Sequence, residues 1–223
     1  MLTRGDQTVE DALDIVDSVG QCGVGDIGFK DIGIAGAAMA ALTRRIKALG
    51  AVSYLEVVSA SPERALQSIE SARALGVDKV LGGTDVESAG RILGDLSRYF
   101  PFPGRPVGHP TRLGGTPEQV AADCRRARAL GCGGVDLLAY RATEADPLDL
   151  VRAARRALDG GELIVAGSVD STARIHDLAR AGADAFTVGT AAFDGSFSPG
   201  KESLRAQIID ILDACRAAPK MDG

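Results

Sequence analysis

The segment 162-ELIVAGSVDSTARIHDLARAGADAFTVGTAAFD-194 decides the fold of this chain. It consists of an apolar run, a stretch of helical periodicity and a second apolar run, at positions 163–166, 171–181 and 185–188. This pattern predicts a strand, a helix and a second strand. Strands that are apolar on both faces and joined by a helix are typical of a parallel sheet that is covered on both sides.

Glycine and a small hydroxyl residue end both expected strands, as Gly167-Ser168 and Gly189-Thr190. Glycine lets a ligand come close to the backbone, a hydroxyl group donates a hydrogen bond, and the N-terminus of the next helix presents free N–H groups to an anion. We therefore predict that these four residues bind a phosphate group. The alternative is that both glycines serve only the close packing of strand against helix.

The same segment resembles the last two strands of the ribulose-phosphate-binding barrels, a TIM-barrel superfamily of phosphosugar isomerases, epimerases, decarboxylases and aldolases. In that superfamily the loops after the seventh and eighth strands hold the phosphate of the substrate. Because the resemblance is confined to one segment, it implies a superfamily and not an individual enzyme. It implies a barrel with a small phosphorylated substrate at the carboxyl ends of its strands.

Glycines that close a helical segment just before an apolar run recur along the whole chain. They are Gly20, Gly50, Gly76, Gly104, Gly131, Gly160 and Gly182. Glycine is the usual residue after the C-terminal end of a helix, so each marks a turn from helix to strand. With a strand at the start of the chain, these turns predict a single-domain (β/α)8 TIM barrel over residues 1–223; an open doubly wound sheet is the alternative.

The expected strands follow from these turns. They are 1–4, 26–30, 52–58, 79–82, 106–109, 135–140, 163–167 and 185–189. The segment from Gly23 to Gly28 matches the dinucleotide-binding pattern letter for letter, but its glycines precede a strand instead of following one. We therefore expect no nicotinamide cofactor, and no cofactor of another kind is predicted.

Composition excludes several classes of partner. With a formal net charge of -5 and a pI near 5.1, the chain lacks the basic character typical of proteins that bind nucleic acid or an anionic membrane surface. No stretch resembles the core of a signal peptide or a membrane span, so we expect a cytoplasmic protein. The Ala-rich helix expected from Ala35 to Leu49 packs either on the barrel or on a second copy of the chain, so a homo-oligomer stays open.

Lys30 and Glu56 are the main candidates for catalysis, because active sites of TIM barrels lie at the carboxyl ends of the strands. Alternation along the second strand sends Lys30 into the barrel mouth, and Glu56 lies at a similar height on the third strand. The pair is either a structural ion pair or a catalytic one. In the catalytic interpretation Lys30 forms a Schiff base or donates a proton to an enolate, with Glu56 as acid and base.

Other polar residues are expected near the same mouth. His109 closes the expected fifth strand, as a proton-transfer group or as a helix cap, and Asp136 lies low in the sixth strand, where it pairs with Lys30 or Lys79. Further substrate contacts are expected from Arg4, Thr84, Tyr140 and Arg141; Thr84 belongs to a second Gly-Gly-Thr motif that resembles the phosphate motif. A metal ligand set of Glu56, His109 and Asp136 is a minor alternative, and no metal is predicted.

These features favour an enzyme that acts on a small phosphorylated sugar or carbonyl compound by imine or enolate chemistry. An aldolase-type lyase and a keto-enol isomerase or epimerase both stay open. The alternative is a non-catalytic regulatory barrel that binds a phosphorylated metabolite, as glycerol-phosphate-responsive antiterminators of similar barrel type do.

Overall fold

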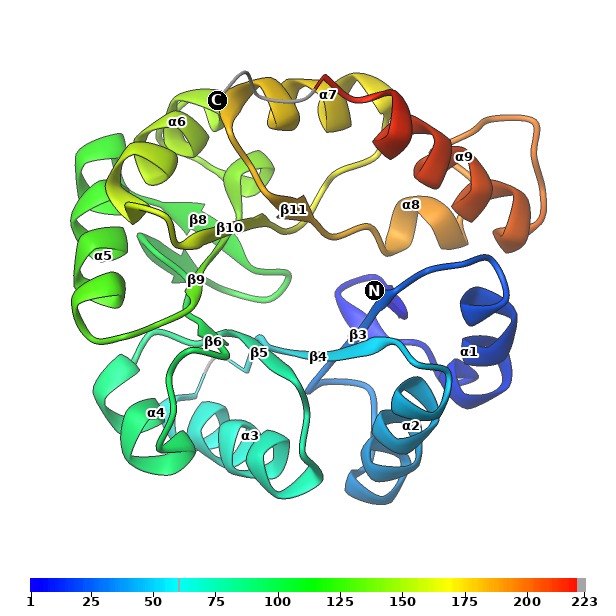
Figure 1. Cartoon of the computed structure of the whole chain (residues 1–223), viewed down its shortest axis with the longest axis horizontal. Coiled ribbons are helices and arrows are strands. Elements are labelled where there is room, and N and C mark those ends of the chain that lie inside the picture. Colours follow the sequence, from blue (N-terminus) through cyan, green and yellow to red (C-terminus); the bar gives the residue numbers. More distant parts are fainter. Residues whose placement is uncertain (60, 220–223) are drawn as a thin grey trace.

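The computed structural model describes residues 1–59 and 61–219 and shows a ring of helices around a central set of strands (Figure 1). One parallel sheet contains β3 (Asp26–Lys30), β4 (Val52–Val57), β5 (Lys79–Gly82) and β6 (Tyr99–Phe100). A second contains β9 (Gly134–Leu137), β10 (Glu162–Val165) and β11 (Ala185–Phe186). All pairs in both sheets are parallel, as strands joined by helices must be.

Single hydrogen bonds join the two sheets into a ring. Asp136 N donates to Pro101 O over 3.1 Å and so connects β9 to the end of β6. On the other side, Leu2 N donates to Gly28 O over 2.7 Å, and Met1 N donates to Val188 O over 2.8 Å. The segment Met1-Leu2 therefore takes the place of the first strand between β11 and β3, and the predicted TIM barrel is confirmed.

The outer helices alternate with the strands. They are α1 (Ala12–Gly20), α2 (Gly36–Ala48), α3 (Pro62–Leu75), α4 (Val86–Leu93), α5 (Pro117–Ala129), α6 (Pro147–Leu158), α7 (Thr172–Ala181) and α9 (Leu204–Ala217). Proline in the first turn of α3, α5 and α6 follows a capping side chain, for example Asp146, which accepts from Leu148 N over 2.8 Å. Among the described residues, no helix combines the length and the apolar character needed to cross a membrane.

Shorter elements lie at the carboxyl ends of the strands. They are the hairpin of β1 (Thr3–Arg4) and β2 (Gln7–Thr8), the hairpin of β7 (Arg105–Val107) and β8 (Arg112–Gly114), the 3-10 turn η1 (Ala139–Arg141) and the single turn α8 (Thr190–Phe193). Both hairpins are antiparallel. They follow the first and fifth barrel positions in the chain, and both contribute side chains to the barrel mouth.

The prediction for the fifth strand was wrong. The strand that pairs with β5 is Tyr99–Phe100, and the expected segment 106–109 belongs instead to the β7–β8 hairpin. Both aromatic side chains are buried in the structure, whereas Val107 is 59% exposed. The strand was concealed because it has only two residues, too few for a measurable periodicity, and is followed at once by prolines at 101 and 103.

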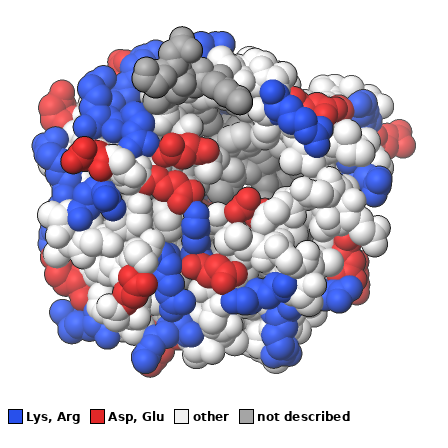
Figure 2. Space-filling model, viewed as in Figure 1, with Lys and Arg blue, Asp and Glu red and all other residues white. Residues whose placement is uncertain are grey.

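Inside the barrel, an apolar cluster separates two charged regions. Leu81, Phe100 and Ile164 form this cluster, apart from the main core between strands and helices. On its amino-terminal side Lys79 Nζ pairs with Glu162 Oε2 over 2.6 Å. The second charged region, around Lys30 at the end of β3, opens toward the barrel mouth. Figure 2 shows that acidic and basic side chains are interspersed over the face seen in Figure 1 and that this face is hollowed near its centre.

Candidate active site

Two cavities enter the barrel from opposite ends. The larger, about 610 Å³, lies at the amino-terminal ends of the strands, and most of its lining is apolar. Its interior charges, Lys79 and Glu162, already form an ion pair. The smaller, about 350 Å³, lies at the carboxyl ends, where TIM barrels place their active sites. It is the candidate site because it joins a buried cluster of charges to the expected phosphate-binding loops: its lining includes Asp6, Lys30, Glu56, Arg141, Gly167, Ser168, Gly189 and Thr190.

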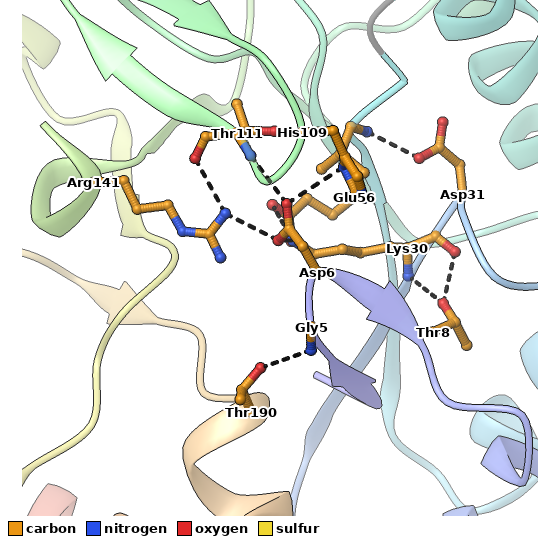
Figure 3. Close-up of polar contacts among 11 residues, drawn as sticks. Gly5, Asp6, Thr8, Lys30, Asp31, Glu56, His109, Thr111, Arg141 and Thr190 are labelled. Atoms are coloured by element: carbon orange, nitrogen blue, oxygen red, sulfur yellow. Dashed lines mark hydrogen bonds and ion pairs between the residues drawn. The ribbon is translucent and has the colours of Figure 1, made fainter. Parts of the chain in front are cut away.

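The carboxylate of Asp6 lies at the centre of the charged cluster (Figure 3). Lys30 Nζ donates to Asp6 Oδ1, and Arg141 Nη1 lies 2.9 Å from the same oxygen. Thr111 N donates to Asp6 Oδ2 over 3.2 Å, and His109 Nδ1 lies 3.7 Å from that oxygen. Four groups from three separate parts of the chain thus converge on one carboxylate, whose side chain is only 1% exposed.

Asp6 reaches this place because the β1–β2 hairpin folds back over the end of β3. Gly5 and Asp6 form its turn with φ angles of 57° and 67°, in the left-handed region that a two-residue hairpin turn requires. Thr8 Oγ1 fixes the hairpin by donating to Lys30 O over 2.8 Å and accepting from Lys30 N over 2.9 Å. Sequence reasoning missed Asp6, although Gly-Asp between two short polar-apolar runs is a signal for such a turn.

Lys30 and Glu56 meet as predicted. They are register partners on β3 and β4, and Lys30 Nζ lies 3.4 Å from Glu56 Oε1. Both side chains are buried, at 6% and 2% exposure. The amine therefore lies between two carboxylates, and it donates its hydrogen bond to Asp6, the one that sequence reasoning did not identify.

Lys30 and Arg141 keep Asp6 ionised. Burial raises the pKa of Asp6, but the charge and hydrogen bond of Lys30, the charge of Arg141 and the N–H of Thr111 outweigh it and lower the pKa from 3.8 to about 2. A depressed pKa means that this stabilisation is present above the unfolded value of 3.8 and is lost as the pH falls through about 2.

Replacing Asp6 with asparagine is accordingly expected to lower the free energy of unfolding by roughly 2–3 kcal/mol at neutral pH, because a pKa difference of one unit corresponds to about 1.4 kcal/mol. The variant is also expected to lose less stability than the parent protein in acid. Urea unfolding between neutral pH and pH 2 measures both effects. If both proteins lost the same free energy of unfolding between neutral pH and pH 2, Asp6 would not be an ionised partner.

The Asp136 carboxyl group occupies the same interior without a hydrogen-bond partner in the described part of the chain. It is fully buried, and neither carboxyl oxygen has a hydrogen-bond partner among the described residues. Burial raises its pKa well above the ordinary value and the charge of Glu56 raises it further, against the opposite effect of Lys30 and Arg141. The expected pairing with Lys30 or Lys79 was wrong, because Lys79 pairs with Glu162 and the nearest cations above Asp136 are committed to Asp6.

The two Gly-hydroxyl motifs line the opposite wall of the cavity. Gly167 and Ser168 both have left-handed backbones, with φ angles of 78° and 57°. A Cβ atom on Gly167 would collide with Nε of Arg141, and one on Gly189 would collide with Oγ1 of Thr3. Both glycines therefore permit a close approach. At Gly167 the group that approaches is a guanidinium, the side chain best suited to bind an oxyanion.

Three expected substrate contacts do not line the cavity. Arg4 is exposed and its Nη2 donates to Phe193 O over 2.8 Å, while Thr84 is exposed in the loop after β5. The ring of Tyr140 lies 4.6 Å from the guanidinium of Arg174 instead. His109 was expected at the end of the fifth barrel strand. It lies instead at the turn of the β7–β8 hairpin, and from there it reaches Asp6.

The donor set does not form a metal centre. Among residues 1–59 and 61–219, no three His, Cys, Asp or Glu side chains are arranged to hold a metal ion. Glu56 faces Lys30, His109 faces Asp6, and Asp136 is enclosed. The alternative ligand set considered from the sequence is therefore not assembled in this part of the chain.

No protein-family model and no curated protein matches the sequence. The structure is similar to orotidine 5'-phosphate decarboxylase from Pyrococcus horikoshii OT3, with a TM-score of 0.66 at 19% identity over 94% of this chain and 95% of that one. It is also similar to native KDPGal, with a TM-score of 0.66 at 13% identity over 96% and 91% of the two chains. Mandelate oxidase with (S)-2-phenylpropionate gives 0.60 at 16% identity over 96% and 69%. At these identities the likeness shows the barrel fold, which hosts several chemistries.

Proposed function

We propose that the whole chain acts as one TIM-barrel enzyme that binds a small phosphorylated sugar or carbonyl compound in the carboxyl-end cavity. The observation that carries this proposal is the buried amine of Lys30, which faces the cavity between Asp6 and Glu56. The two carboxylates can accept the proton that the ammonium must lose before it forms an imine, and the ammonium can donate a proton in an enolate mechanism. The name of the structurally similar decarboxylase contains a 5'-phosphate, which agrees with a phosphorylated substrate for this chain.

The phosphate is proposed to bind at Gly167-Ser168 and Gly189-Thr190, with Arg141 beside it. Backbone N–H groups at glycine turns neutralise an oxyanion without a bulky side chain, and a guanidinium adds charge. Arg141 uses Nη1 for Asp6 and Thr111 O, and its Nε edge lies against Gly167. The cavity of about 350 Å³ holds only a small molecule, and Lys30 lines it together with the glycine loops. With the phosphate at those loops, the carbonyl end of the substrate therefore extends toward Lys30.

The proposed chemistry begins at Lys30 Nζ. The ammonium gives one proton to a cavity carboxylate, and the amine forms a bond to the carbonyl carbon. The carbonyl oxygen takes one proton back from that carboxylate and one from the bonded nitrogen, and it leaves as water, which gives an iminium ion. That cation accepts the electrons of an adjacent C–C or C–H bond. Glu56 takes the proton released, which comes from the hydroxyl group of the departing fragment in the first case and from carbon in the second. Breaking the C–C bond is aldolase-type lyase chemistry, and breaking the C–H bond is isomerase or epimerase chemistry.

Reductive trapping tests this function directly. The full chain is incubated with phosphorylated ketones and aldehydes of three to six carbons, treated with borohydride and mapped by peptide mass spectrometry. The expected result is a covalent adduct on Lys30 that disappears in Lys30→Ala. Lys79→Met is the matched control, because Lys79 is a barrel-interior lysine at the opposite end of the strands and its loss is expected to leave the adduct intact.

Two other outcomes contradict the imine route. If no adduct forms and Lys30→Ala still converts the substrate, Lys30 is not a nucleophile. If phosphorylated compounds bind without any conversion, the regulatory barrel is the better description, and Lys30 is then a structural partner of Asp6 and Glu56.

A further inference from the structure

Arg174 holds the loop that carries the Gly167-Ser168 motif. It lies in the first turn of α7, and its Nη1 donates to Ser168 O over 2.5 Å and to Asp170 Oδ2 over 2.6 Å. Ser168 is one of the few residues other than glycine with a positive φ, at 57°. A left-handed backbone at a residue with a Cβ atom persists only where surrounding contacts hold it, and the Arg174 guanidinium supplies such a contact.

The same guanidinium also contacts the neighbouring loop. Its central carbon lies 4.6 Å from the centre of the Tyr140 ring, in the geometry of a cation–π contact. Tyr140 belongs to η1, which also carries Arg141, the guanidinium that lies against Gly167. Arg174 therefore connects the loop after β9, with its cationic side chain, to the loop after β10, with its left-handed glycine and serine.

A helix-surface ion pair does not account for this arrangement. The Arg174–Asp170 pair alone, between side chains that are 37% and 46% exposed, is of a kind that contributes little to stability. The contacts with the Ser168 carbonyl and the Tyr140 ring reach residues outside α7, and Ser168 lines the cavity. Arg174 itself does not line the cavity, so any effect on a ligand passes through Ser168 and Tyr140.

We propose that Arg174 is a positioning residue that fixes Ser168 and the Tyr140–Arg141 turn as one preformed anion site. This inference rests on the phosphate site proposed above. A preformed site binds more tightly because its loops lose less conformational freedom when the ligand arrives. Lysine in place of Arg174 keeps the positive charge but loses the planar group that contacts Ser168, Asp170 and Tyr140 together.

Titration of the full chain with inorganic phosphate, followed by isothermal calorimetry, tests the inference. Arg174→Gln is expected to weaken phosphate binding about tenfold, which corresponds to about 1.4 kcal/mol. Arg174→Lys and Tyr140→Leu are expected to weaken it to a similar extent, whereas Tyr140→Phe keeps the ring and the affinity. The matched control is Arg180→Gln. Arg180 lies in the same helix and pairs with Asp177 over 2.5 Å, and this substitution removes the same charge as Arg174→Gln.

Thermal unfolding without phosphate separates positioning from general stability. The melting temperatures of Arg174→Gln and Arg180→Gln are expected to agree while their phosphate affinities differ. If the parent protein binds no phosphate, the proposed phosphate site itself is wrong. If the parent protein binds and the Arg174 and Tyr140→Leu variants bind equally well, only the positioning role is overturned. Should Arg174→Gln not fold, the same comparison is decided by Arg174→Lys and Tyr140→Leu.

Discussion

Replacement of Lys30 by methionine is expected to lower the free energy of unfolding by about 3–5 kcal/mol at neutral pH, because it removes one partner of a buried ionic cluster. Asp6 and Glu56 would then lie in the barrel with side chains at 1% and 2% exposure and without the amine between them. Methionine fills a similar volume, so the loss measures the charge and not a void. Urea unfolding at a single pH is sufficient for the comparison.

Two further variants identify the origin of this loss. Lys79→Met removes the other interior lysine, but Lys79 and Glu162 are 27% and 31% exposed, so a loss of only about 1 kcal/mol is expected. The double variant Lys30→Met with Asp6→Asn is expected to recover part of the stability, because the uncompensated charge at Asp6 is removed as well. A Lys30→Met protein as stable as the parent would show that the amine does not hold the cluster together.

Asp136→Asn is expected to raise the free energy of unfolding, and to raise it more as the pH increases. The pKa of Asp136 is raised well above its ordinary value, first by burial and then by Glu56. A raised pKa means that the unfolded chain releases the proton more readily than the folded one. The contribution of this group to stability is therefore complete below the unfolded pKa of 3.8 and is lost progressively as the pH rises toward the folded pKa.

Asparagine has no such titration, so the difference in stability between variant and parent reports on Asp136 alone. Near pH 4 the two proteins are expected to differ little. Near pH 8 the variant is expected to be more stable than the parent, by a margin that grows as the pH rises. Asp149→Asn, at an exposed aspartate of α6, controls for the general loss of negative charge.

The contrary result would assign Asp136 a different state. If Asp136→Asn destabilises the protein to the same extent at both pH values, Asp136 is an ionised partner of Lys30 and Arg141 and not a neutral acid. The two possibilities differ in chemistry as well. A neutral carboxylic acid next to Glu56 and Lys30 is a source of protons beneath the site, whereas an ionised one adds a third negative charge around the amine.

Several features of the site followed from local pattern. Alternation along two strands placed Lys30 and Glu56 inside the barrel, and their shared register in a parallel pair brought them together. The Gly-hydroxyl pairs after the last two strands were also visible in the sequence, because each follows an apolar run; the strands themselves end earlier, at Val165 and Phe186. Tyr140 was placed on a strand that in the structure ends at Leu137, since the apolar run 135–140 does not distinguish a strand from the 3-10 turn that follows it.

The sequence by itself determined the alternation of strands and helices, and with it the barrel, because burial and backbone hydrogen bonding repeat with periods that neighbouring residues display. Only the tertiary structure decided what surrounds Lys30. Asp6 and Thr111 are 105 positions apart and meet because two hairpins fold over the same mouth once the ring of strands has closed. The partners of a buried charge depend on the closed ring and its loops, and no period along the chain records them.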